Sequence, residues 1–251
     1  MERRFDGRTA LVTGSTSGIG AQVARTLAAQ GALVVVSGRR VERGEAVAEE
    51  IEAAGGRAVF VPADLAAGGA AVRGLADATL AAVGGRLDIL VNNAALLLEP
   101  RPTAEVDEAT LDAAYAVSVK SAFQLTGALV PAMAERGSGV VINMGSISGT
   151  SGWADSALYS MTKAAVHSLT KSWAAEYGPR GVRVNAVAPG PTATAENIAH
   201  ADQLAPLLAT TPSGRLGRLD EVAAAVAFLA CDEASHIHGA ILPVDGGFTA
   251  V

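Results

Sequence analysis

The sequence has one cysteine, Cys231, and few aromatic or charged residues, which make up 4% and 18% of its 251 residues. A single cysteine cannot form a disulfide within the chain, and it suits a reducing compartment. We interpret Cys231 as a small apolar residue near a helix end. The formal net charge is −6 and the basic residues are scattered, so neither a nucleic acid nor an anionic membrane is an expected partner.

The sequence also lacks the run of about 18 apolar residues that a membrane-spanning helix needs. Residues 1–7 lack the apolar stretch of a secretory signal, so we expect a cytoplasmic protein. The four histidines, at positions 167, 200, 236 and 238, do not have the spacing of metal ligands. We therefore expect no metal site, and we expect each histidine to be hydrogen-bonded or exposed to solvent.

Hydrophobic residues make up 50% of the chain, and short β-branched runs alternate with alanine-rich helical stretches. This alternation predicts an α/β fold, a doubly wound Rossmann domain whose parallel sheet has helices on both faces. No linker or low-complexity tract divides the sequence, so we expect residues 1–251 to form a single dinucleotide-binding and catalytic domain. The seven expected strands are residues 9–12, 33–36, 58–61, 89–91, 140–143, 182–187 and 241–244. The expected helices are residues 18–30, 41–54, 68–84, 105–135, 157–178 and 217–231.

A glycine-rich segment, residues 13–20, follows the first expected strand and leads into a helix. Glycines allow a tight turn and a close approach of the backbone to a pyrophosphate, whose charge is favoured at a helix N-terminus. The spacing is G-x-x-x-G-x-G, which differs from the commoner G-x-G-x-x-G pattern. We expect cofactor contacts from Gly14, Ser15, Ser17, Gly18, Ile19 and Gly20.

The second expected strand ends in Ser37-Gly38-Arg39-Arg40, without an acidic residue. An acid at this point hydrogen-bonds the ribose 2′-hydroxyl of NAD, whereas arginine accommodates the 2′-phosphate of NADP. The arginines therefore favour NADP(H) over NAD(H). The alternative is that Arg39 and Arg40 only cap a solvated helix.

Tyr159 and Lys163 lie four residues apart in an expected helix, so both side chains project from one face. The pKa of a phenol is too high for tyrosine to act as a base near neutral pH, but a neighbouring ammonium favours the phenolate and lowers this pKa. The pair is therefore a candidate for general acid–base catalysis. Taken alone, it could equally be an ordinary pair of neighbours on a helix surface.

The glycine-rich segment and the Tyr159-x-x-x-Lys163 pair together resemble the short-chain dehydrogenase/reductase family. Further motifs of that family occur in order, and the resemblance covers about residues 6–249. These motifs are Ala63-Asp64-Leu65, Asn92-Asn93-Ala94, Ser146 thirteen residues before Tyr159, Pro189-Gly190, Arg215-Leu216-Gly217-Arg218 and Asp245-Gly246-Gly247.

The resemblance implies a hydride-transferring oxidoreductase that acts on a ketone or a secondary alcohol. It makes Tyr159 the general acid–base, Lys163 the residue that holds the nicotinamide ribose, and Ser146 the donor to the substrate oxygen. Asp64 would contact the adenine, although it could also cap the following helix. The implied cofactor contacts beyond the glycine-rich segment are Arg39, Arg40, Asp64, Leu65, Asn92, Ala94, Tyr159, Lys163, Pro189, Gly190, Thr192 and Thr194.

The chain departs from the family pattern at two positions. Ala95 replaces a glycine, and Ser118 replaces an asparagine that helps to hold a proton-relay water. A serine hydroxyl can also bind water, so we count Ser118 among the catalytic residues and expect a weakened relay. The alternative function is a catalytically weak or inactive nucleotide-binding scaffold or sensor.

Apolar residues near the expected site, residues 96–98 and Trp153, suggest a substrate with a hydrophobic body, such as a 3-oxoacyl thioester. Residues 96–98 could instead pack in the core. Arg101 is the one residue near this segment that could bind a charged group. The resemblance further implies a homotetramer.

Overall fold

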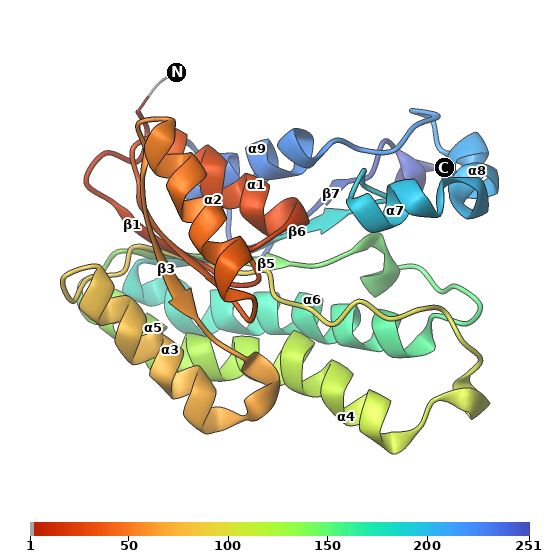
Figure 1. Ribbon diagram of the computed structural model, residues 1–251, viewed down its shortest axis with the longest axis horizontal. Coiled ribbons are helices and arrows are strands. Elements are labelled where there is room, and N and C mark those ends of the chain that lie inside the picture. Colours follow the sequence, from red (N-terminus) through yellow and green to blue (C-terminus); the bar gives the residue numbers. More distant parts are fainter. Residues whose placement is uncertain (1–2) are drawn as a thin grey trace.

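The computed structural model describes residues 3–251, apart from the side chain of residue 201, and is built on one parallel sheet (Figure 1). The strand order is β3-β2-β1-β4-β5-β6-β7, and every neighbouring pair is parallel. The seven predicted strands are therefore confirmed. Their bounds are β1 Thr9–Val12, β2 Leu33–Gly38, β3 Arg57–Pro62, β4 Ile89–Asn92, β5 Gly139–Met144, β6 Val182–Pro189 and β7 Ile241–Val244.

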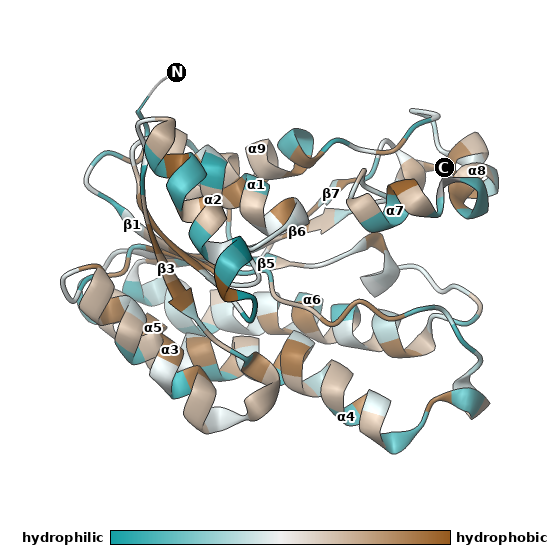
Figure 2. Ribbon diagram, viewed as in Figure 1, coloured by the Kyte–Doolittle hydropathy of each residue, from teal (hydrophilic) through white to brown (hydrophobic). Residues whose placement is uncertain are grey.

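The strands β4, β5 and β6 are buried along their whole length, which explains why their sequences are mostly apolar. β7 lies at the edge of the sheet and is only partly buried. It contains Pro243, whose missing N–H is tolerated because only one neighbour pairs with the strand. Figure 2 shows the apolar colouring concentrated on the strands and polar colouring on the outer surfaces of α1 and α2.

Helices cover both faces of the sheet, α1, α2 and α9 on one and α3 to α6 on the other (Figure 1). Each face has its own hydrophobic core, the first built on α1 and α9 and the second on α3, α5 and α6. Within residues 3–251, no helix has both the length and the apolar character that spanning a membrane requires. The helix bounds are α1 Gly18–Ala29, α2 Val41–Ala53, α3 Gly69–Ala82, α4 Glu108–Tyr115, α5 Ser121–Glu135, α6 Ala157–Tyr177, α7 Ala195–Ala199, α8 Ala201–Thr210 and α9 Leu219–Ala230.

The prediction of one helix over residues 105–135 is wrong. The segment begins with a short 3₁₀ turn and then forms α4 and α5, which are separated by a π-helical turn, Ala116–Lys120. Periodicity detects the apolar face of such a segment but not the extra residue in one turn. The short helices α7 and α8 were also missed, whereas the other predicted helices end within two residues of their observed bounds.

Candidate active site

The carboxyl ends of the parallel strands meet along one edge of the sheet, and the sequence motifs follow these ends. The chain reverses its winding direction between β1 and β4, which are neighbours in the sheet. Ligands of open α/β sheets bind in the crevice at such a switch point. The loops after β1, β4, β5 and β6 carry most of the predicted site residues, so the topology brings these residues to one edge.

The glycine-rich segment forms a tight turn whose shape depends on glycine. Gly14 and Gly18 have φ values of +63° and +55°, and a Cβ on Gly14 would lie 2.9 Å from the Ala94 Cα. Ser17 is the N-cap of α1, and within the described chain its side chain makes no capping hydrogen bond. The first N–H groups of α1 therefore remain available for an anion, which fits the pyrophosphate of a dinucleotide.

Asn93 fixes this turn, a role that the sequence analysis missed. Its Nδ2 donates hydrogen bonds to the carbonyl oxygens of Thr13 and Gly14, at 2.8 and 3.0 Å. In return, the backbone N–H groups of Asn93 and Ala94 each donate to the Thr13 Oγ1 at 3.0 Å. The Asn92-Asn93 pair after a buried strand was the available signal, but the sequence does not show which asparagine faces the turn.

Two residues predicted to contact the cofactor direct their side chains into the protein. Ser15 Oγ donates to the Val12 carbonyl at 2.6 Å and accepts the Ser37 N–H at 2.9 Å, which joins the ends of β1 and β2. Asn92 Nδ2 donates to Asn143 Oδ1 at 2.9 Å, which joins β4 to β5. The Ser15 hydroxyl and the Asn92 Nδ2 thus join neighbouring strands, whereas the buried Oδ1 of Asn92 has no hydrogen-bond partner in the described chain.

The residues predicted to recognise the adenosine lie at the ends of β2 and β3. Arg39 and Arg40 are exposed, and neither forms an ion pair with any residue of the described chain. Asp64 is exposed and accepts the Ala66 N–H at 3.0 Å, so it caps the short turn after β3. Leu65 is buried beneath this turn. The capping alternative therefore holds for Asp64, and it leaves the second carboxylate oxygen free.

Lys163 lies beneath Tyr159 on α6, and it is 4% exposed. Its Nζ is 5.6 Å from the centre of the Tyr159 ring and donates a hydrogen bond to the Met144 carbonyl at 2.8 Å. Burial lowers the pKa of Lys163 to about 8, because a buried ammonium loses its hydration. The ammonium is thus held between α6 and the end of β5, and two of its three protons remain free to donate.

The pKa of Tyr159 shifts opposite to the direction predicted from the sequence. Burial raises the pKa of the phenol, the Ser146 side chain partly lowers it, and the Glu196 carboxylate raises it further. The predicted lowering by Lys163 does not outweigh the effect of burial, and the Nζ of Lys163 instead donates its hydrogen bond to the Met144 carbonyl. Tyr159 is consequently protonated near neutral pH, which is the form that donates a proton.

Ser146 is buried at the start of the loop after β5, and its hydroxyl oxygen accepts the Ser148 N–H at 3.1 Å. The Ser146 hydroxyl also faces the Tyr159 phenol, and its hydrogen bond to the phenol is the contribution that lowers the Tyr159 pKa. Ser148, the alternative within this loop, points its N–H back at Ser146 and is only partly buried. This arrangement supports Ser146 as the donor to the substrate oxygen.

Two glycines on either side of Ser146 allow its loop to approach α6 closely. A Cβ on Gly145 would lie 2.3 Å from the His167 Nε2, and a Cβ on Gly149 would lie 2.5 Å from the His167 Cε1. His167 is 5% exposed, and neither ring nitrogen has a hydrogen-bond partner in the described chain. The expectation of a hydrogen-bonded or exposed histidine is therefore wrong at this position. Burial, followed by the charges of Lys163 and Lys171, lowers the pKa of His167 and keeps it neutral.

The other histidines agree with expectation. His200, His236 and His238 are exposed, and the Nδ1 of His200 lies 2.9 Å from the Glu196 carbonyl. In the part of the chain that the structure describes, no three potential metal ligands come together. Cys231 is buried at the end of α9, as predicted.

Ser118 lies in the π-helical turn and is buried. Its Oγ accepts the Leu96 N–H at 3.2 Å, which ties the loop after β4 to this turn. The hydroxyl proton of Ser118 has no recorded acceptor within residues 3–251. The predicted relay at Ser118 remains a prediction, because its water is outside what the structure describes.

The segment after β6 folds back on itself beside the glycine-rich turn. Pro189 ends β6, and a Cβ on Gly190 would lie 2.9 Å from the Asp245 Cα. Thr192 forms a bridge with Gly217. Thr194 caps α7 and lies next to Gly18, since a Cβ on Gly18 would be 3.9 Å from the Thr194 methyl group. The motifs at residues 215–218 and 245–247 thus pack against the segment after β6.

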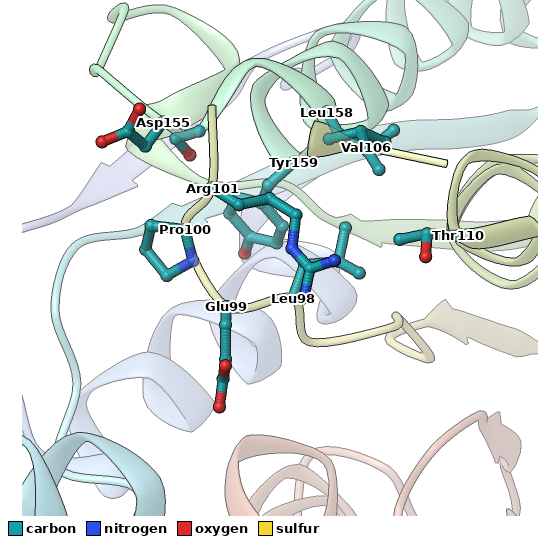
Figure 3. Close-up of a pocket in the computed structure, with 10 residues that line it drawn as sticks. Leu98, Glu99, Pro100, Arg101, Val106, Thr110, Asp155, Leu158 and Tyr159 are labelled. Atoms are coloured by element: carbon teal, nitrogen blue, oxygen red, sulfur yellow. The ribbon is translucent and has the colours of Figure 1, made fainter. Parts of the chain in front are cut away.

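A shallow cleft that Tyr159 helps to line lies between the loop after β4 and the start of α6 (Figure 3). Its lining is mixed, with Leu98, Val106 and Leu158 on the apolar side and Arg101 on the polar side. The described lining does not include Trp153, which instead packs against Phe248 with a distance of 5.1 Å between ring centres. Leu97 is 63% exposed, so the alternative that residues 96–98 all pack in the core is wrong.

A helix N-terminus suited to a pyrophosphate thus lies at the same sheet edge as Tyr159 and Lys163, a combination that fits a dinucleotide-dependent oxidoreductase. A family model described as "Enoyl-(Acyl carrier protein) reductase" matches residues 14–249. The cis-4-hydroxycyclohexanecarboxylate dehydrogenase of Sinomonas cyclohexanicum is 43% identical, with 100% of each chain covered. The 3-oxoacyl-[acyl-carrier-protein] reductase of Escherichia coli is 38% identical, with 98% of this chain and 99% of the relative covered.

Solved structures agree with these relatives. A putative NAD(P)-dependent gluconate 5-dehydrogenase from Beutenbergia cavernae, with bound NADP, is 37% identical and has a TM-score of 0.93. The alignment covers 100% of both chains. The chain therefore belongs to the short-chain dehydrogenase/reductase family. It is an NAD(P)-dependent oxidoreductase that acts on alcohol or ketone substrates, and its fold matches the structures of this family.

Proposed function

We propose that this enzyme interconverts a secondary alcohol and a ketone that are attached to a largely apolar body, with a preference for NADP(H). The observation that carries the proposal is the position of Tyr159. Its phenol lies at the base of the cleft, above the buried Lys163 ammonium and next to Ser146. The apolar side chains of Leu98, Val106 and Leu158 supply the walls against which such a body packs.

Two residues act on the substrate oxygen, and a third holds the cofactor. In the direction of reduction, the Tyr159 phenol donates its proton to the carbonyl oxygen, and the Ser146 hydroxyl stabilises the charge that develops there. Lys163 orients the cofactor ribose with the protons that the Met144 carbonyl does not take. The nicotinamide, when bound, supplies or accepts the hydride.

The relatives indicate which apolar bodies to try. One relative is named for cis-4-hydroxycyclohexanecarboxylate, a secondary alcohol on a compact ring, and another for a 3-oxoacyl thioester. Purified enzyme with NADPH would be offered 4-oxocyclohexanecarboxylate, 4-methylcyclohexanone and an acetoacetyl thioester, and NADPH oxidation would be followed by absorbance. Turnover of at least one ketone is expected. Failure with all of them would contradict the proposed substrate class.

The variant Tyr159→Phe separates chemistry from binding. It removes the proton donor and retains the ring, so turnover should fall by about two to four orders of magnitude, the usual contribution of a positioned acid. Binding of NADPH, measured through nicotinamide fluorescence, should persist. An unchanged rate would refute the role of Tyr159 and favour the reading of the protein as a nucleotide-binding scaffold or sensor.

The cofactor preference rests on Arg39 and Arg40. Both arginines are exposed at the end of β2, where the adenosine ribose of a bound dinucleotide lies, and residues 36–40 include no acidic residue. Separate titrations with NADPH and NADH should show tighter binding of NADPH. The variant Arg39→Asp should reverse the preference, and equal affinities in the unaltered protein would overturn it.

We also propose a homotetramer, as the family resemblance implies. The long helices α5 and α6 carry exposed apolar side chains, Phe123 at 57% and Met161 at 46%, that a partner could cover. Light scattering should give about four times the chain mass, and a monomeric mass would remove the proposal.

A further inference from the structure

The cleft above Tyr159 contains one positively charged group whose role the oxidoreductase chemistry does not explain. Arg101 lines the cleft together with the apolar walls and the catalytic phenol. Figure 3 shows the Arg101 side chain among the residues that line this cleft, and Arg101 is exposed to solvent. Reaction at a carbonyl needs no second cation there, so this charge points to another part of the substrate.

The guanidinium is free to bind an anion. No carboxylate within residues 3–251 lies at ion-pair distance from Arg101, and its side chain has no recorded hydrogen bond there. Figure 3 shows the carboxylates of Glu99 and Asp155 directed away from it. The pKa of Asp107 is lowered mainly by its hydrogen bonds with Thr110, whose N–H it accepts at 2.7 Å, and the charge of Arg101 makes the smallest contribution.

The backbone around Arg101 is held in place across the cleft. The Arg101 N–H donates to the Asp155 carbonyl at 2.7 Å, which joins the loop after β4 to the loop that precedes α6. Asp155 has a φ of +61°, and it is the only non-glycine residue of the described chain in the left-handed region. Such strain persists where the surroundings enforce it, and it is concentrated at binding sites. The hydrogen bond therefore fixes the position of the Arg101 main chain, from which the side chain extends.

From these observations we infer that Arg101 is a specificity-determining residue that binds a carboxylate on the substrate, at the end opposite the reacting carbon. This inference rests on the proposed function. An acid with a compact apolar body places its ring against Leu98 and Val106 and its carboxylate at the guanidinium fork, which matches carboxylate geometry with two parallel hydrogen bonds. Neutral ketones of the same shape lack this contact and should bind less tightly.

Binding and turnover are measured separately, so that the two proposals can fail separately. Calorimetry on the enzyme saturated with NADP⁺ compares cyclohexanecarboxylate with cyclohexanecarboxamide, a neutral compound of similar shape that cannot react at the ring. In the unaltered enzyme the acid should bind more tightly, and its advantage should shrink as salt is raised.

The variant Arg101→Gln should reduce the affinity for the acid relative to the amide by about tenfold, the effect of losing a charge-assisted pair at a partly exposed site. Arg101→Lys should recover part of it. The matched control is Arg73→Gln on α3, which removes the same charge from an exposed position outside the cleft and should leave the ratio unchanged.

A ratio that Arg101→Gln leaves unchanged, or that falls equally in the Arg73 variant, would overturn the inference. So would an unaltered enzyme that binds the acid no better than the amide. Reduction of neutral ketones without a preference for acids would refute the role of Arg101 but not the proposed function. Arg101-dependent binding of the acid without any turnover would support the role of Arg101 and refute the proposed function.

Discussion

The buried Lys163 should destabilise the folded enzyme while it serves the active site. Burial lowers its pKa from the ordinary 10.5 to about 8, and the difference corresponds to about 3 kcal/mol of unfavourable free energy when the group is charged. Within residues 3–251, the only hydrogen bond that its Nζ makes is to the neutral carbonyl of Met144. The variant Lys163→Met keeps the aliphatic chain and removes the charge, so near pH 7 it should unfold at higher denaturant concentration than the unaltered enzyme.

The pH dependence gives a sharper test. Between about pH 8 and 10.5 the unfolded chain holds a proton on Lys163 that the folded chain has lost. Stability of the unaltered enzyme therefore rises with pH in this window, by about 1.4 kcal/mol per pH unit from this group alone. The advantage of Lys163→Met should accordingly shrink by about 2 kcal/mol between pH 7 and 9.5.

Urea unfolding at matched protein concentration and several pH values measures this difference, and comparison of variants cancels the titration of all other groups. The control is Lys171→Met, the same substitution on an exposed lysine of the same helix, which should not show the pH-dependent gain. A Lys163→Met protein that is less stable than the unaltered enzyme at pH 7, or a difference that does not change with pH, would refute the reasoning. Turnover should be lost in either case.

Three further predictions concern the surroundings of the acid–base pair. Gly149→Ala should destabilise the fold by about 1–3 kcal/mol through overpacking against His167, and it should lower turnover. In the control Gly152→Ala, the added Cβ meets no described atom within 4 Å, so stability and turnover should not change. Urea unfolding measures the stability of both variants, and steady-state kinetics measures their turnover. Ser118→Asn should raise turnover if the relay is weakened, and an unchanged rate would contradict this. Because burial raises the pKa of Tyr159, the rate of ketone reduction should stay level through neutral pH, while the rate of alcohol oxidation should increase with pH; a pH–rate profile with equal slopes in both directions would contradict it.

The fold could be predicted almost completely because its strands are buried on both faces. The run at residues 33–36, for example, is apolar at every position, and a strand of a parallel sheet covered on both faces is expected to have such a sequence. What sequence could not supply was the break between α4 and α5. A π-helical turn changes the hydrogen-bond register by one residue and leaves the composition of the helix unaltered.

The sequence could predict which residues come together at the site, but it could not predict the directions of their side chains. The positions of Gly14, Ser146 and Lys163 follow from motifs, since each follows or faces the end of a strand. The direction of the Tyr159 pKa shift, in contrast, depends on burial and on where the ammonium points, which only the three-dimensional packing decides. For the same reason the exposure of Arg101 and its bond to the Asp155 carbonyl could not be foreseen.

Several unfavourable features of the enzyme are located together, and this has a consequence for ligand binding. Lys163 is buried with a single neutral partner, His167 has no hydrogen-bond partner in the described chain, and Asp155 has a strained backbone. All three lie in α6 or directly before it, whereas the apolar clusters on both faces of the sheet are continuous. A bound ribose would give the Lys163 ammonium the partners that it lacks. The cofactor should therefore protect the backbone amides of the first turns of α6 from hydrogen exchange more strongly than those of α3, and equal protection of the two helices would argue against a destabilised catalytic edge.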